Sequence, residues 1–224
     1  MRLLAIDTAL EACSCAILDT GRREPLMALR SEEMSRGHAE VLLPLVAEMM
    51  KESNIVFSSL DRVAVTTGPG SFTGLRVGIA AARGIGLSAE KPVVGLSTLA
   101  ALAAPHIAED DSLPVVVAID ARHSHVYLQV YGPGGRTLIS PRIAPLQEAI
   151  AAAQAAPARI VGSAAQAVAD GCSETPILVD ARRFADIVWV ARLGAAANEG
   201  AAAKPLYLRA PDAQPQTASQ LPRR

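Results

Sequence analysis

Leu3-Leu4-Ala5-Ile6-Asp7 has a counterpart in Val115-Val116-Val117-Ala118-Ile119-Asp120, and these two stretches decide the fold. Each is a short apolar run, typical of a buried strand, and each ends at an aspartate. In both cases a second, alternating strand and a glycine turn follow. The tripeptide Ala-Ile-Asp thus occurs at 5–7 and at 118–120, a spacing of 113 residues that predicts an internal duplication.

Helices and further strands alternate around the first copy. The hydrophobic pattern predicts strands at residues 12–18, 26–30, 62–67 and 92–96. Helices are expected at residues 39–52, 74–89 and 98–107. Ser71 or Thr73 is placed to cap the second of these helices, and Ser97 is placed to cap the third.

The second half repeats this arrangement in a sequence rich in alanine. Residues 126–131 alternate, and Gly132-Pro133-Gly134-Gly135 forms a turn. Helices are predicted at residues 147–156, 164–169 and 184–197, with short strands near Ile160 and Ile177. The sequence therefore predicts an α/β protein with two related lobes, each a mixed sheet with flanking helices. The lobes are expected at residues 1–108 and 109–210, followed by a disordered tail at 211–224.

Composition excludes several classes of protein. The 224 residues carry 21 Lys and Arg against 22 Asp and Glu, so no basic excess is available to bind nucleic acid unaided. Aromatic residues, which could stack on bases, make up only 3%. The longest uncharged stretch, residues 92–108, falls short of the ~20 apolar residues of a membrane span. Three cysteines, an odd number, favour a reducing compartment, and we expect a cytoplasmic protein without a membrane partner.

The duplicated strand, aspartate and hairpin resemble the two lobes of the actin-like ATPase (ASKHA) superfamily, the fold of hexokinase and Hsp70. That resemblance implies that Asp7 and Asp120 flank a cleft for nucleotide phosphates. Backbone closure on a phosphate favours glycine two residues after the aspartate, but Ala9 and Arg122 stand there. We therefore expect a vestigial nucleotide region, without a cofactor, made of Asp7, Thr8, Gly68, Gly70, Ser71 and Asp120.

The segment Gly68-Pro69-Gly70-Ser71 joins a predicted strand to a predicted helix, a place where helix N-termini attract anions. It lacks the Lys-Ser/Thr ending of a P-loop, so a structural turn is the preferred interpretation. Ser71 lies in Gly-Pro-Gly-Ser-Phe-Thr-Gly and not in a Gly-x-Ser-x-Gly nucleophile elbow, which disfavours a serine peptidase. No catalytic residue is predicted.

Histidines and cysteines give only weak candidates for a metal site. His38 opens a helix, but Leu42 occupies the position of a second helical ligand, so a capping or surface role is favoured for His38. Two pairs share a strand face and could form a mixed site: His123 with His125, and Cys13 with Cys15. Surface and core roles are favoured for these pairs, and no metal site is predicted.

Two helices carry more apolar or small surface than one sheet contact needs. The 39–52 helix is apolar on two faces, and the 74–89 helix repeats small residues every four positions, as Gly74, Gly78, Ala82 and Gly86. Large residues of the first helix could enter grooves left by the small ones of the second; alternatively, each helix covers only its own sheet. We predict a partner interface at Val41, Leu42, Leu45, Met49, Gly74, Leu75, Gly78, Ile79 and Ala82.

The chain also resembles the bacterial TsaB (YeaZ) family over roughly residues 1–210. The resemblance rests on six stretches, which are Leu3–Thr8, Gly37–Pro44, Gly68–Gly78, Gly95–Leu99, Ile119–Arg122 and Pro205–Arg209. The Gly68–Gly78 stretch is highly specific to the family, whereas the second half matches more thinly.

The resemblance implies a non-catalytic paralogue of the transferase subunit TsaD. Such proteins serve the threonylcarbamoylation of adenosine 37 in tRNAs that read codons beginning with A. They bind TsaD through helices of the N-terminal lobe, help to recruit the ATPase TsaE, meet tRNA only through the complex, and form homodimers when alone. TsaD carries a metal-binding histidine pair, which Leu42 prevents this chain from rebuilding at His38.

Two other functions stay open from the sequence alone. One is a nucleotide-binding enzyme of the same superfamily, a small kinase or ATPase with Asp7 and Asp120 at the phosphates. The other, less favoured, is a glycoprotease-like peptidase with Ser71 as its nucleophile.

Overall fold

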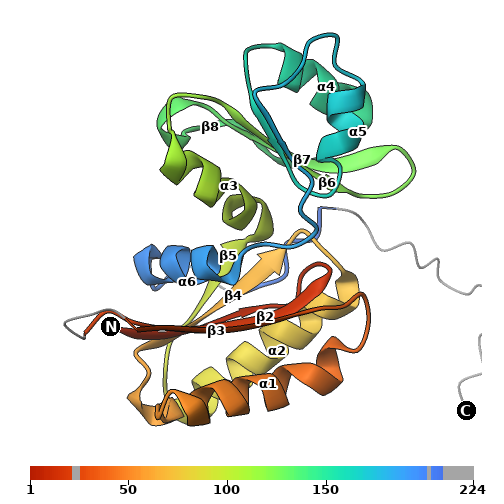
Figure 1. Cartoon of the computed structure of the whole chain (residues 1–224). Coiled ribbons are helices and arrows are strands. Elements are labelled where there is room, and N and C mark those ends of the chain that lie inside the picture. The colour runs from red at the N-terminus through yellow and green to blue at the C-terminus, as the bar shows by residue number, and fades with distance from the viewer. Residues whose placement is uncertain (22–25, 201–202, 209–224) are drawn as a thin grey trace, which may run out of the picture.

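Two lobes, each built on a five-stranded mixed sheet, form the molecule and lie one above the other in Figure 1. The computed structural model describes residues 1–21, 26–200 and 203–208. The tail predicted at 211–224 lies outside the described residues.

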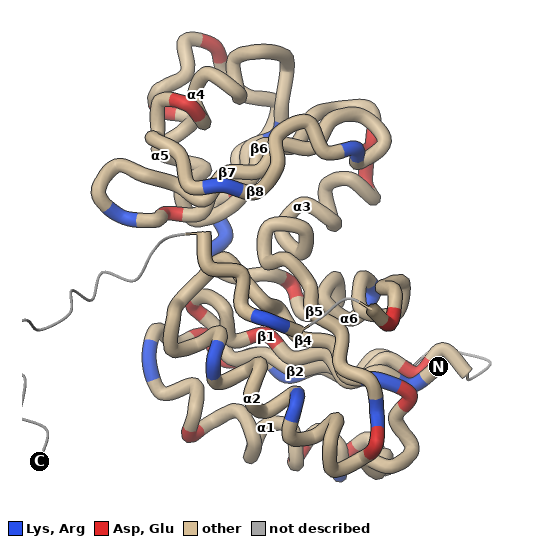
Figure 2. Tube along the Cα trace, turned by 180° about the vertical axis from the view of Figure 1, so that it is seen from behind, with Lys and Arg blue, Asp and Glu red and all other residues tan. Residues whose placement is uncertain are grey.

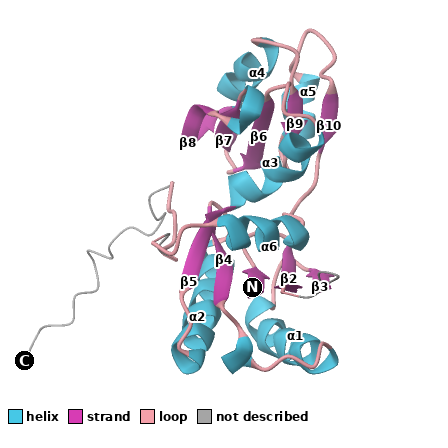
Figure 3. Ribbon diagram, turned by 90° about the vertical axis from the view of Figure 1, so that its left-hand side faces the viewer, coloured by secondary structure: helices cyan, strands magenta, loops and turns pink. Residues whose placement is uncertain are grey.

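The first sheet has the strand order β3-β2-β1-β4-β5. An antiparallel meander, β1 (Arg2–Asp7), β2 (Ala12–Asp19) and β3 (Leu26–Glu33), is followed by the parallel strands β4 (Arg62–Gly68) and β5 (Val93–Ser97). Helices α1 (His38–Glu52) and α2 (Phe72–Ala89) cover one face of this sheet (Figure 3). The Ser71 hydroxyl accepts a hydrogen bond from the Gly74 amide, so Ser71 caps α2, one of the two caps predicted.

The second sheet repeats this connectivity in the order β8-β7-β6-β9-β10. Its strands are β6 (Val115–Asp120), β7 (His125–Tyr131), β8 (Thr137–Pro145), β9 (Arg159–Val161) and β10 (Leu178–Asp180). Helices α4 (Leu146–Gln154) and α5 (Ala165–Asp170) cover its outer face, and single 3-10 turns occur at Phe57–Ser59 and Pro133–Gly135. The prediction of two related actin-like lobes is confirmed, although β8 was not anticipated.

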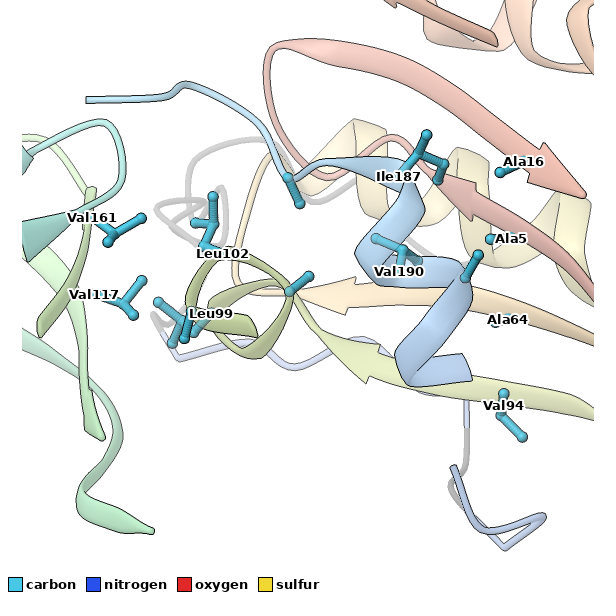
Figure 4. Packing of buried hydrophobic residues seen from close by; sticks show 14 of the residues in the cluster. Ala5, Ala16, Ala64, Val94, Leu99, Leu102, Val117, Val161, Ile187 and Val190 are labelled. Atoms are coloured by element: carbon cyan, nitrogen blue, oxygen red, sulfur yellow. The ribbon is translucent and has the colours of Figure 1, made fainter. Parts of the chain in front are cut away.

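The last helix of each half packs against the sheet of the other half. Helix α3 (Thr98–Glu109) follows β5 but lies on the second sheet, mainly against β6. Helix α6 (Ile187–Ala196) follows β10 but lies on the first sheet, against β1, β2 and β4. Figure 4 shows the shared core that results, with Leu99 and Leu102 facing Val117 and Val161, and Val190 between the first sheet and α3.

The lobe boundary differs from the predicted division after residue 108. The second sheet ends with β10, and the chain then returns to the first lobe through α6. Residues 203–208 also lie on the first lobe, where the Leu206 amide donates to the Thr67 carbonyl oxygen at 2.7 Å. The exchange of α3 and α6 between the sheets could not be predicted from the sequence, because an apolar helix face does not specify which sheet it covers.

Two buried arginines secure the exchanged helices in matching ways. Arg159, the first residue of β9, donates to the carbonyl oxygens of His106 (2.6 Å) and Asp110 at the C-terminal end of α3. Arg62, the first residue of β4, donates to the carbonyl oxygens of Gly194 (3.1 Å) and Ala197 (2.6 Å) at the C-terminal end of α6. The unpaired carbonyls of a helix end attract cations, so each guanidinium ties one lobe to the other.

The strand register corrects the predicted repeat. Arg62 pairs with Leu3 of β1, and its counterpart Arg159 pairs with Val115 of β6. Leu3 and Val115 are therefore equivalent, so the structural repeat is 112 residues and not 113. Side chains alternate along a strand, so the difference of one residue reverses the face. Ala5 accordingly lies in the core between the lobes, whereas Ala118 lies in the outer core under α4 and α5. The two Ala-Ile-Asp tripeptides are not structural equivalents.

Replacing Arg159 with leucine should lower the free energy of unfolding by about 2–4 kcal/mol, because several buried carbonyl oxygens lose a charged donor. Arg62→Leu should have a similar effect on the other exchanged helix. Urea unfolding followed by circular dichroism measures both. The control is Arg142→Leu, which breaks an exposed ion pair with Glu148 and should cost less than about 1 kcal/mol. Equal effects at Arg142 and Arg159 would contradict the assignment.

Candidate functional site

The candidate site lies where β1 and β4 end. Parallel strands bring their C-terminal ends to the same edge of a sheet, a usual place for ligands in α/β folds. Asp7 and Thr8 come from the end of β1, and Gly68, Gly70 and Ser71 come from the loop between β4 and α2. The structure therefore brings together five of the six residues predicted for the vestigial nucleotide region. The sixth, Asp120, belongs to the second sheet.

Asp7 is fully buried and shapes the turn after β1. Its Oδ1 accepts hydrogen bonds from the Ala9 amide (3.0 Å) and from the Thr66 hydroxyl (2.5 Å). Its Oδ2 is buried without a hydrogen-bond donor among the described residues. Burial raises the pKa of Asp7, and the bonds from Thr66 and Ala9 and the nearby His38 oppose that rise. This carboxyl group has no access to solvent. An aspartate that binds the water ligands of a metal ion would need such access.

The turn that would meet phosphates in an active ATPase is covered by α2. Thr8 and Ala9 are at most 1% exposed. The Thr8 hydroxyl donates to the Gly74 carbonyl oxygen at 2.7 Å, and the Ser71 amide donates to the Ala9 carbonyl oxygen at 2.7 Å. A Cβ at Gly74 would lie 2.1 Å from the Thr8 oxygen, and one at Gly70 would lie 2.2 Å from the Ala9 oxygen. Both glycines are therefore needed for this close backbone approach.

Two more segments pack around the same strand ends. The Leu206 carbonyl oxygen would lie 3.1 Å from a Cβ at Gly68, which ends β4. On the other side, Arg183 and Glu11 form an ion pair at 3.1 Å between the connection to α6 and the β1–β2 turn. A phosphate could reach the backbone of residues 7–9 only if α2 moved away.

Asp120 has a different environment. Its side chain is exposed, and its Oδ1 accepts a hydrogen bond from the Arg122 amide at 2.8 Å. Its own amide donates to the Ser163 hydroxyl at 3.0 Å. Asp7 and Asp120 both end a strand and accept from the amide two residues on, but they do not form the symmetric phosphate pair that the repeat predicted, because the strands are offset by one residue.

The residues predicted for the partner interface are mostly part of the chain's own core. Eight of them are buried beneath the first sheet: Leu42, Leu45, Met49, Gly74, Leu75, Gly78, Ile79 and Ala82. Val41 is half-buried. The predicted groove is not free, since Gly74 and Gly78 lie against Thr8 of the same chain. The small residues thus serve the contact of α2 with its own sheet, which was the alternative explanation.

A different face of the same two helices is exposed to solvent. Leu43 of α1 is 54% exposed and Leu87 of α2 is 83% exposed, and small exposed residues accompany them, namely Ala47, Ala80 and Gly84. The helices lie side by side on the outside of the molecule (Figure 1). We call Leu43, Ala47, Ala80, Gly84 and Leu87 the outer helix face. Leu43 belongs to the same apolar run as the buried residues, so the sequence could not separate the two sides.

The remaining candidates have structural roles. His38 is buried, not at the surface, with its Nε2 3.1 Å from the Leu10 carbonyl oxygen. Cys13 and Cys15 are buried on β2, where burial raises their pKa values to about 11 and about 12. His123 and His125 are exposed at the β6–β7 turn of the other lobe. Within residues 1–21, 26–200 and 203–208, no cluster of His, Cys, Asp and Glu has the arrangement of a metal site.

None of the helices in the described part of the chain has both the length and the apolar character needed to cross a bilayer.

Asp7→Asn tests the buried carboxyl group. An acid whose pKa is raised by folding loses stability as the pH rises from its unfolded pKa through its folded pKa, at about 1.4 kcal/mol per unit of pKa difference. The stability of the Asn variant relative to the unmutated chain should therefore increase in urea unfolding as the pH rises above about 3.8, the ordinary pKa of an aspartate. Asp120→Asn, which removes an exposed carboxyl group at the end of the other lobe's strand, serves as control. A constant difference for Asp7→Asn would contradict the burial argument.

Comparison with known proteins places this geometry in a family. Residues 30–203 match the family model for TsaD, the tRNA N6-adenosine threonylcarbamoyltransferase. TsaB of Escherichia coli (strain K12), named a tRNA threonylcarbamoyladenosine biosynthesis protein, is 40% identical over 131 residues, which are 58% of this chain and 55% of that protein. The chain thus spans about half the length of this relative.

Two further matches extend over nearly the whole chain. An uncharacterized protein of Mycobacterium tuberculosis (strain ATCC 25618 / H37Rv) is 35% identical over 95% of this chain and 94% of its own. The solved structure of YeaZ from Pseudomonas aeruginosa superposes with a TM-score of 0.77 at 32% identity, covering 92% of this chain and 99% of that one. With its match to the TsaD family model and its likeness to YeaZ along nearly the whole chain, the chain belongs to the TsaB (YeaZ) family.

Proposed function

We propose that this chain is a non-catalytic subunit of the machinery that threonylcarbamoylates adenosine 37 of tRNAs reading codons that begin with A. It docks on TsaD through the outer helix face, stabilises the active form of that subunit and helps to recruit TsaE. Its tRNA contacts arise only within the complex. The relative from E. coli is named for biosynthesis of this modified nucleoside, which supports the assignment.

One observation carries the non-catalytic part of the proposal. Thr8 and Ala9 of the β1–β2 turn, where related ATPases meet their phosphates, are buried under the N-terminal end of α2 and hydrogen-bonded to it. Catalysis of group transfer needs groups that reach the substrate. Thr8 instead holds α2 through the Gly74 carbonyl oxygen, Asp7 binds the Ala9 amide and the Thr66 hydroxyl of β4, and Ser71 caps α2.

The exposed apolar surface supports the docking part. Leu43 and Leu87 each leave a large apolar side chain more than half exposed, and a partner that covered them would remove this apolar surface from water. Small residues such as Ala80 and Gly84 let another helix approach closely.

Charges flank this apolar surface with opposite signs on the two helices. Helix α1 exposes Glu40 and Glu48, and α2 exposes Arg76 and Arg83 without any acidic residue. Two copies related by a two-fold axis would place α1 of one against α2 of the other, which accounts for a homodimer when TsaD is absent.

Leu87→Asp should weaken binding to TsaD by about 30-fold or more, because a charge would be buried in an apolar contact. Isothermal titration calorimetry measures the affinity, and a reconstituted modification assay with TsaD, TsaE, ATP, a threonylcarbamoyl donor and tRNA should lose activity in parallel. The control is Leu138→Asp on β8, where the leucine is 49% exposed and lies on the other lobe. Unchanged affinity for Leu87→Asp, or equal loss for both variants, would contradict docking through this face.

Magnesium-ATP should not bind to the isolated chain at micromolar concentration, since the strand-end site is filled by the chain itself. Calorimetry with the purified protein tests this directly. Micromolar binding that disappears in Asp7→Ala would instead favour a nucleotide-binding enzyme.

A further inference from the structure

Three exposed side chains gather beside the N-terminal end of α2. The guanidinium of Arg76 lies over the ring of Phe72 at 3.7 Å, and its Nε donates to the Tyr207 hydroxyl at 3.2 Å. The two rings are 5.5 Å apart. Phe72 is 48% exposed and Tyr207 is 47% exposed, so the cluster stands on the surface.

This arrangement is unusual for so aromatic-poor a chain, which has only three Phe, three Tyr and one Trp. Two of its exposed aromatic rings meet on one arginine. Stacking of an exposed arginine on an exposed ring contributes little to folding, so stability alone gives a weak reason for the cluster. Aromatic rings and arginine are, however, the side chains that most often dominate the energy of a protein interface.

Two contacts fix the orientation of the Arg76 guanidinium and leave its terminal nitrogens available to a ligand. Stacking on Phe72 fixes its plane, and the bond to Tyr207 uses its Nε. Within the described residues, the two terminal nitrogens of Arg76 make no hydrogen bond. A planar fork of this kind matches a carboxylate with two parallel hydrogen bonds, and fixing the fork beforehand lowers the entropy lost on binding.

The cluster continues the outer helix face. Phe72, Arg76, Ala80, Gly84 and Leu87 follow each other at intervals of three or four residues, which places them on one stripe of α2. A helix lying along this stripe would therefore meet the cluster at one end of its contact. Because the stripe carries Arg76 and the neighbouring Arg83 but no acidic residue, the complementary helix is an acidic one. Figure 2 shows the basic residues on the trace of α2.

We propose that Phe72, Arg76 and Tyr207 form an anchor that binds a carboxylate on a helix of the partner protein. The inference rests on the proposed function, in which that partner is TsaD, and it names the contact that orients the two proteins. Net charge and composition favour a protein over RNA, because the chain has no basic excess for phosphates.

The test uses full-length chain and TsaD with calorimetry. Arg76→Glu should weaken binding by about 100-fold, since it places like charges together, and Arg76→Lys by about 5- to 10-fold, since it keeps the charge and loses the fork. Tyr207→Phe should weaken binding only a few-fold, because the ring stays and only the hydroxyl that orients Arg76 is lost. Circular dichroism confirms that each variant is folded.

Arg192→Glu provides the matched control. Arg192 also lies over an aromatic ring, that of Trp189 at 4.7 Å, but on α6. Its replacement should change the affinity less than about 2-fold.

The outcomes separate the anchor from the docking proposal. If Arg76→Glu binds TsaD as the unmutated chain does while Leu87→Asp does not, the anchor is wrong and docking through the outer helix face stands. If the unmutated chain does not bind TsaD, both proposals fail. If Arg76→Glu keeps its affinity for TsaD but the complex loses affinity for tRNA in a mobility-shift assay, the cluster contacts RNA and the protein anchor is overturned.

Discussion

The exchange of the two final helices between the lobes is the constraint on which the rest of the structure depends. Arg62 and Arg159 hold the ends of α6 and α3 through buried hydrogen bonds, and the apolar core between the lobes includes residues from both sheets. Neither sheet can cover its inner face with helices from its own half alone. The two lobes are therefore parts of one folding unit, and their relative orientation is set by charge-assisted bonds as well as by packing.

This constraint bears on function at the ends of β1 and β4. In nucleotide-using relatives of this fold, that edge is where a ligand would enter. Here the backbone of α2 approaches the β1–β2 turn so closely that Gly70 and Gly74 have no room for a side chain. The polar groups that could have served chemistry have structural partners instead. The Asp7 carboxyl binds the Ala9 amide and the Thr66 hydroxyl, and the Thr8 hydroxyl binds the Gly74 carbonyl oxygen of α2. What α1 and α2 still offer to other molecules is their outer surface.

The sequence predicted most helices, the strand pattern and the two-lobe architecture, because these follow from local periodicity and capping by Ser71 and Ser97. The sequence did not predict the features that depend on tertiary contacts between distant segments. The glycine repeat of α2 correctly indicated a close contact, but only the fold identifies Thr8 as the neighbour. The repeated Ala-Ile-Asp suggested equivalent aspartates, but one residue of offset places Asp7 inside and Asp120 outside. Leu43 and Leu42 are adjacent in one apolar run, and burial alone distinguishes them.

We propose that this protein acts by docking and not by catalysis. Threonylcarbamoylation of tRNA, reconstituted with TsaD, TsaE, ATP and a threonylcarbamoyl donor in the presence and absence of the chain, measures this. We expect no modification by the chain alone, little by TsaD and TsaE without it, and full activity when all three are combined. Turnover by the isolated chain, or full activity of TsaD and TsaE in its absence, would show that the chain does not work as a docking subunit.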